Sequence, residues 1–147
     1  MKKLLIMLLL LINLKAEDSF MGVEMLSKVD ENKWLCKEYW IKPFNTCSPK
    51  TKFLEITNII TDKQGRIVQI WHKENPNNKP TENYMDWAKS IFEKLNLVNK
   101  YGKFDYKKTE WGGFISYKKV NNTLIQVVID ATPNIHFTHD LYNQLKE

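Results

Sequence analysis

The clearest pattern in this chain is a run of apolar residues that recur every three or four positions between residues 84 and 95. In a helix this spacing places them on one face. Glu82 and Asp86 lie near the positive end of the helix dipole and Lys94 lies near its negative end, as the dipole favours. Thr81 precedes them as a suitable N-cap. The pattern therefore predicts one long amphipathic helix, whose apolar face comprises Tyr84, Trp87, Ala88, Ile91, Phe92 and Leu95.

Other stretches are rich in β-branched and aromatic residues, which is typical of strands. Residues 62–65 supply a turn between the first two stretches, and residues 121–122 supply a tight turn between the last two. Strands joined by such short turns pair antiparallel. The stretches are residues 53–61, 66–73, 104–108, 114–120 and 123–130.

The remaining segments carry weaker patterns. Residues 20–29 hold a partial helical stripe, residues 34–49 indicate a loop, and residues 138–145 indicate a short helix capped by Thr138. Tight hairpins without strand–helix–strand alternation favour an antiparallel sheet with its helices on one face. We predict an α+β fold, with an antiparallel sheet of four to five strands, one long amphipathic helix packed on one face, and short helices at the N- and C-terminal ends.

The first sixteen residues have the three parts of a secretory signal peptide. Lys2 and Lys3 form a positive start, an apolar run follows, and Ala16 offers a small residue for cleavage. A membrane anchor is the alternative, but it needs about 20 apolar residues, and this run is much shorter. We expect residues 1–16 to be cleaved and residues 17–147 to form a single domain that is periplasmic or secreted, with no stable membrane span.

Cys36 and Cys47 are the two cysteines of the chain. An oxidising compartment favours pairing them. The spacing is not that of a CxxC redox centre, and two thiols cannot complete a tetrahedral zinc site without histidine partners. We predict a structural disulfide that closes a loop at residues 36–47 and stabilises the fold by roughly 3 kcal/mol.

The formal net charge of +5 depends on the predicted signal peptide. Residues 1–16 contain three lysines and no acidic residue, so cleavage leaves a net charge of +2. Arg66 is the single arginine, and arginine is the residue best suited to bidentate contacts with phosphates and bases. We therefore expect no nucleic acid partner.

Few residues point to catalysis or metal binding. His136 and His139 form an HxxH spacing, but the metalloprotease pattern is HExxH, so we expect two solvated histidines at a helix start. His72 lies in a strand pattern near Glu74, and spacing alone gives it neither a partner nor a pocket. We predict no catalytic residue, no metal site and no cofactor, and catalysis is the least favoured function.

An aromatic cluster surrounds the cysteine pair. Its rings can pack on the disulfide, which is the commoner role, or stand on the surface as binding anchors. We predict a small binding protein of the bacterial cell envelope, whose partner is an envelope or extracellular protein, as an inhibitor, immunity protein or adhesin-like module. The alternative is a small-molecule or lipid carrier with an apolar pocket between helix and sheet, and the third hypothesis is a small envelope hydrolase. The candidate binding residues are Trp34, Tyr39, Trp40 and Phe44.

Overall fold

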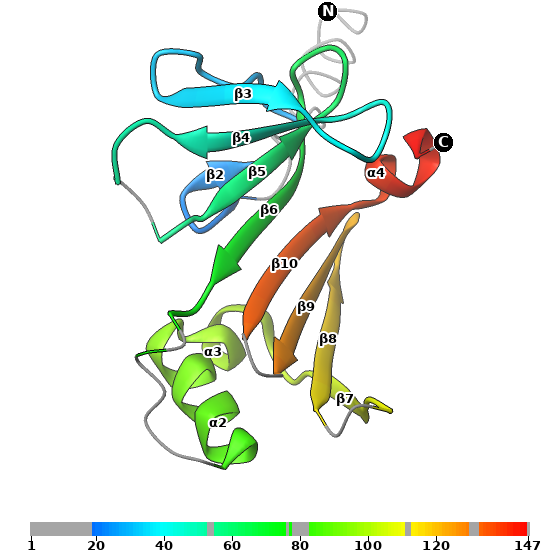
Figure 1. The fold of residues 1–147 in the computed structure, drawn as a ribbon. Helices are drawn as coiled ribbons and strands as arrows, with labels where there is room; N and C mark the ends of the chain where they lie inside the picture. Colours follow the sequence, from blue (N-terminus) through cyan, green and yellow to red (C-terminus); the bar gives the residue numbers. More distant parts are fainter. Residues whose placement is uncertain are drawn as a thin grey trace, which may run out of the picture.

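The structure is a computed structural model that describes residues 19–52, 55–75, 77, 83–110, 113–129 and 133–146. The expected signal peptide at residues 1–16 and the expected helix cap Thr81 lie outside these residues. The described part of the chain is mostly β (Figure 1), with 45% of these residues in strands and 19% in helices.

Two meanders joined edge to edge make up the main sheet. Strands β3 to β6 form the first meander and β7 to β10 form the second, and β6 pairs antiparallel with β10. The sheet order is β3-β4-β5-β6-β10-β9-β8-β7, and every pairing in it is antiparallel. The strands are β3 (Trp34–Glu38), β4 (Asn45–Pro49), β5 (Asn58–Thr61), β6 (Ile67–Lys73), β7 (Asp105–Lys108), β8 (Phe114–Val120), β9 (Thr123–Ile129) and β10 (Asn134–His139).

The predicted α+β fold with four to five strands and one long helix is wrong. Eight strands form the main sheet in the described part of the chain, and the helices there are short. The segment expected to be a loop is the β3–β4 hairpin, and β10 occupies a segment without a predicted strand. In β10 the side chains alternate between the two faces of the sheet, since Ile135 and Phe137 are fully buried and His136 between them lies on the other face.

Three helices occur in the described residues: α2 (Tyr84–Lys94), α3 (Leu97–Tyr101) and α4 (Asp140–Leu145). The side chain of Asn83 caps α2 by accepting hydrogen bonds from the backbone of Met85 at 2.9 Å and of Asp86 at 3.4 Å. Asn96 adopts a left-handed conformation with φ of 52° and separates α2 from α3. In the part of the chain that the structure describes, no helix has the length and apolar character to span a membrane.

The predicted N-terminal helix is also wrong. Strands β1 (Ser19–Phe20) and β2 (Val23–Glu24) form a small hairpin there. Its turn places Met21 and Gly22 at φ values of 52° and 81°, which no helix tolerates. The apolar residues of this segment are buried all the same, because the hairpin presses Phe20, Val23 and Met25 into the core.

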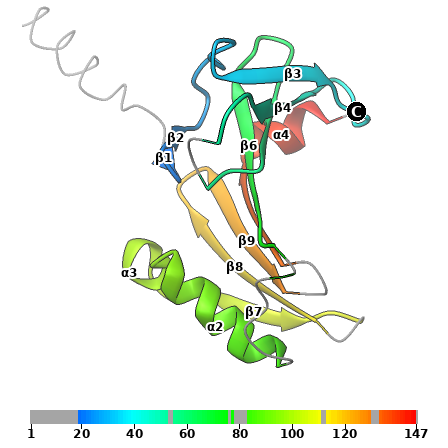
Figure 2. The same cartoon turned by 60° about the vertical axis from the view of Figure 1, so that its left-hand side comes forward.

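Helices cover the two faces of the sheet at different ends (Figure 2). Helix α2 packs on β9, and Tyr101 of α3 contacts Phe137 on β10. On the same face of the sheet, Ile59, Ile70, Phe137 and Ile125 form a row of core residues that stand opposite one another. We call this side the helix face. Helix α4 packs on the opposite face, where Tyr142 stacks on Phe44 with ring centroids 4.6 Å apart.

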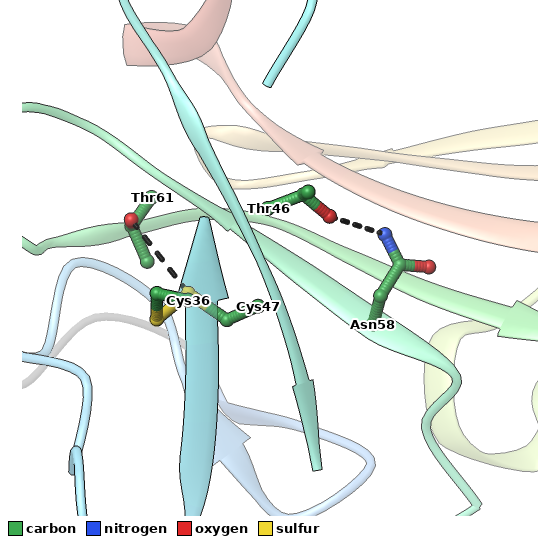
Figure 3. The surroundings of a disulfide bond; sticks show 5 residues. All are labelled: Cys36, Thr46, Cys47, Asn58 and Thr61. Carbon is green, nitrogen blue, oxygen red and sulfur yellow. Dashed lines mark hydrogen bonds between the residues drawn. A yellow bond between two sulfur atoms is a disulfide. The ribbon is translucent and has the colours of Figure 1, made fainter. Parts of the chain in front are cut away.

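The predicted disulfide between Cys36 and Cys47 is confirmed (Figure 3). The two residues stand directly opposite each other on β3 and β4, with Cys47 fully buried and Cys36 exposed. Thr61 on β5 lies next to the bond, with its Oγ1 4.0 Å from Cys47 Sγ. A side-chain hydrogen bond also joins β5 to β4 here, since Asn58 Nδ2 donates to Thr46 Oγ1 at 3.3 Å. The bond fastens the outermost strand β3 to the sheet.

Candidate functional site

A groove lies between helix α2 and the end of the sheet formed by β7 and β8. Ser116 on β8 stands opposite Val127 of the buried core and opposite Tyr106 on β7. Directly paired residues share a face of a sheet, so Ser116 and Tyr106 lie on the helix face. Helix α2 packs on β9, and the sheet continues beyond it through β8 and β7. These two strands form the floor of the groove.

The groove has a volume of about 340 Å³ and an almost wholly apolar lining. Two aromatic rings meet in it edge to face, since the rings of Phe92 on α2 and Phe104 before β7 are perpendicular with centroids 5.0 Å apart. The described lining residues are Met85, Ala88, Lys89, Phe92, Val98, Lys103, Phe104, Tyr106, Phe114 and Ser116.

The apolar face of α2 is wider than the core beneath it. Trp87 and Ile91 point into the core and are almost fully buried. Ala88 and Phe92 follow each of them by one position, so they form a second stripe beside the first. This second stripe is half-buried and lines the groove. The predicted apolar face of α2 therefore contacts the core with one stripe and lines the groove with the other.

Large hydrophobic side chains remain exposed around the groove. Met85 is 44% exposed, Val98 is 52% exposed and Tyr106 is 70% exposed, and all three line it. They come from three consecutive elements of the chain, α2, α3 and β7. Exposed apolar side chains that gather at one concave site mark a binding surface more often than scattered ones do.

The charged residues that line the groove are both lysines. Lys89 comes from α2 and Lys103 from the segment between α3 and β7. Asp86 lies 3.9 Å from Lys89, but both side chains are more than half exposed, so this pair is weak. No acidic residue is present among the described residues of the lining. The charged side chains in the described lining are therefore all cationic.

An ionic cluster around the buried carboxylate of Glu74 anchors the C-terminal end of α2 to the end of β6. His72 Nε2 lies 2.9 Å from Glu74 Oε1, and Lys94 Nζ lies 3.2 Å and 3.4 Å from the two carboxylate oxygens. Burial acts to raise the pKa of Glu74, but the hydrogen bonds and charges of His72 and Lys94 outweigh it, and the pKa is lowered overall. The carboxylate is thus charged at neutral pH and holds the helix against the sheet.

This cluster leaves no ring nitrogen of His72 for a substrate. His72 Nδ1 donates to the backbone carbonyl of Glu55, and Nε2 faces Glu74. A general base needs a nitrogen within reach of the proton that it removes. The structure therefore brings His72 and Glu74 together, as an enzyme hypothesis requires, but one nitrogen of His72 is occupied by the backbone of Glu55 and the other by the carboxylate that holds α2.

The two C-terminal histidines lie on strand β10 and are largely shielded from solvent, which corrects the expectation of solvated residues at a helix start. His136 stacks on Trp71 with ring centroids 3.9 Å apart, on the face opposite α2. His139 is 6% exposed, and its Nδ1 accepts a hydrogen bond from the backbone of Leu141 at 3.1 Å, which caps α4. Three positions along a strand place the two rings on opposite faces. Within the described residues, no group of histidine, cysteine or acidic side chains could hold a metal ion.

The four aromatic residues predicted for binding do not gather on one surface. Trp34 is 5% exposed and belongs to the core on the helix face, whereas Phe44 is buried in the core against α4. Tyr39 is half-buried beside that second core. Trp40 is 80% exposed, with its ring centroid 5.6 Å from that of Tyr39. Of the four, Trp40 is therefore the residue that a partner can reach.

Comparison with known protein families, with curated proteins and with solved structures finds no match to this chain. Sequence reasoning named none of the groove residues as a site, although two signals were present. The apolar stripe of α2 is too wide for one core contact, and Tyr106 is a large aromatic residue flanked by Asp105 and Lys107.

Proposed function

We propose that this protein binds a small apolar molecule in the groove beside α2 and holds or carries it outside the cytoplasm. The observation that carries the proposal is an open groove of about 340 Å³ with an almost wholly apolar lining. Ligand pockets range from roughly 300 to 1,000 Å³ and are mostly apolar with a few polar groups. The groove lies at the lower end of that range, which suits one small molecule or a single hydrocarbon chain.

Burial of exposed apolar surface supplies the driving force. A ligand in the groove would cover Met85, Val98 and Tyr106, which are exposed in the free protein. Removing apolar surface from water stabilises a complex by about 25 cal/mol per Å² before the entropic costs of binding. The location outside the cytoplasm is part of the proposal, and the disulfide, which persists in oxidising compartments, is compatible with it.

The first prediction tests the groove by filling it. We expect the neutral fluorescent probe N-phenyl-1-naphthylamine to bind the wild-type protein and to bind at least tenfold more weakly to Ser116→Trp, whose indole would occupy the groove. Tyr117→Trp is the matched control, because Tyr117 is the next residue of β8 and faces the other side of the sheet. Fluorescence titration measures the affinities.

Thermal unfolding of each variant excludes a folding defect. If Ser116→Trp lowers the melting temperature, Val98→Glu provides a second test, since Val98 is 52% exposed and a charge there leaves the core intact. Equal probe affinity for the wild-type protein and for folded variants at positions 98 and 116 would contradict the proposal.

A second candidate function is contact with an envelope or extracellular protein through Trp40. An exposed tryptophan is the residue type most enriched at interface hot spots. Trp40 lies in the connection between β3 and β4 and is 80% exposed. The exposed ring, rather than the predicted cluster of four, supports this candidate.

The second prediction compares two tryptophans of this region. Trp40→Ala should leave the melting temperature unchanged, whereas Trp34→Ala should destabilise the fold by about 3 to 5 kcal/mol because Trp34 is buried. If the exposed ring is an anchor, capture of an envelope protein by the wild-type chain should be lost with Trp40→Ala. Capture that survives this substitution would rule out the candidate, and urea unfolding provides the stability comparison.

A further inference from the structure

The positive charge of the groove is positioned where a ligand would enter. Lys89 and Lys103 belong to the lining and are themselves exposed, so their ammonium groups lie at the solvent side of an apolar site. They come from separate elements, one from α2 and one from the segment before β7. An arrangement of apolar walls and cationic edges matches a molecule that has a hydrocarbon part and an anionic part.

The neighbourhood adds positive charge and little that neutralises it. Lys118 is half-buried, and its Nζ would lie 3.7 Å from a Cβ placed on Gly102, the residue beside Lys103. Lys103 makes no ion pair with any described residue. The contact of Lys89 with Asp86 is weak and exposed, so Lys89 can bind an anionic ligand in place of Asp86 at little energetic cost.

We propose that the ligand is a free single-chain amphiphile with an anionic head group, such as the carboxylate of a fatty acid, and this rests on the proposed function of the groove. The chain lies among Phe92, Phe104 and Phe114, and the head group binds Lys89 and Lys103. A volume of about 340 Å³ favours one chain over two. The specificity comes from the lysines, since the aromatic walls would accept any apolar chain.

The test compares three amphiphiles with the same chain and different head groups. Dodecanoate, dodecanol and dodecyltrimethylammonium are each tested for displacement of N-phenyl-1-naphthylamine, at concentrations below the micelle concentration of the two ions and below the solubility limit of dodecanol. Dodecanoate should bind about tenfold more tightly than dodecanol, and dodecyltrimethylammonium should bind more weakly than both. The advantage of dodecanoate should shrink as salt is added, because the lysines are exposed.

The double variant Lys89→Gln/Lys103→Gln should remove the preference for dodecanoate and leave the affinity for dodecanol unchanged. The matched control is Lys63→Gln/Lys107→Gln, which removes the same net charge from exposed residues outside the groove lining. A preference for dodecanoate that persists in the groove variant, or is lost equally in the control, would overturn the assignment of the head group.

The outcomes separate the two proposals. Equal affinity for the three amphiphiles, with binding still blocked by Ser116→Trp, would disprove the anionic ligand and preserve the apolar groove. Absence of binding for the probe and all three amphiphiles would disprove both. Sedimentation with phosphatidylglycerol vesicles that depends on Lys89 and Lys103, without displacement of the probe by dodecanoate, would assign these lysines to a membrane surface and overturn the inference.

Discussion

At the scale of single residues, His136 has an environment that disfavours its charged form. Its ring stacks on Trp71, and its Nε2 has no hydrogen-bond partner among the described residues. Burial, followed by the positive charge of Lys73, lowers the pKa of His136 from 6.5 to about 4. The imidazole is therefore neutral in the folded protein at pH 7 and at pH 5, whereas an unfolded chain protonates it below pH 6.5.

This difference predicts a loss of stability in mild acid. A histidine whose folded pKa is depressed contributes fully above its unfolded pKa, and the contribution is lost as the pH falls from 6.5 towards 4. Between pH 7 and pH 5 the free energy of unfolding should fall by about 2 kcal/mol because of this residue. His136→Phe keeps a ring on Trp71 but cannot titrate, so its stability should depend less on pH. Urea unfolding at the two pH values measures the difference.

Glu74 should contribute little to the change in the free energy of unfolding between pH 7 and pH 5. The pKa of Glu74 is lowered below its usual 4.5, so its contribution is lost only when the pH falls below that value. The other histidines are present in both proteins and cancel in the comparison. An identical pH dependence for the wild-type protein and His136→Phe would contradict the assigned environment of His136.

At the scale of elements, local patterns predicted the parts of the sheet whose partners lie next to them in the chain. The predicted strands at residues 114–120 and 123–130 match β8 and β9 closely, because the turn at Asn121 and Asn122 joins them directly. The hairpin of β5 and β6 was predicted for the same reason. The pairing of β6 with β10 was not, since 60 or more residues separate the partners in the sequence, and no local signal indicates the contact.

Two elements were mispredicted. A hairpin has apolar residues at helix-like spacing, and a strand contains polar residues that resemble a different motif. Phe20, Val23 and Met25 have helix-like spacing, yet positive φ values at Met21 and Gly22 turn the chain back. In β10 the alternation of Ile135 and Phe137 with polar residues was a strand signal, which the HxxH spacing obscured. The groove residues could not be identified from sequence, because no local pattern shows that the sheet extends through β8 and β7 beside the second stripe of α2.

At the scale of the whole molecule, the disulfide and the groove lie at opposite ends of one sheet. The disulfide joins β3 and β4, the groove floor is β8 and β7, and strands β5, β6, β10 and β9 lie between them (Figure 1). The β3–β4 hairpin packs against β5 and the core beside it, whereas the groove depends on α2, which the Glu74 cluster holds to β6. The disulfide cross-link and the proposed binding groove therefore depend on different parts of the sheet.

This separation predicts that reduction of the disulfide weakens the fold without changing the groove. Cys36 is exposed and accessible to reductant, and loss of the cross-link should lower the free energy of unfolding by roughly 3 kcal/mol. Under conditions where the reduced protein stays folded, its affinity for N-phenyl-1-naphthylamine should equal that of the oxidised protein. Urea unfolding and probe titration with and without reductant measure both quantities, and alkylation of the free thiols prevents reoxidation. A parallel fall in stability and probe affinity would mean that the two ends of the sheet are coupled, because the folded reduced protein would then have an altered groove.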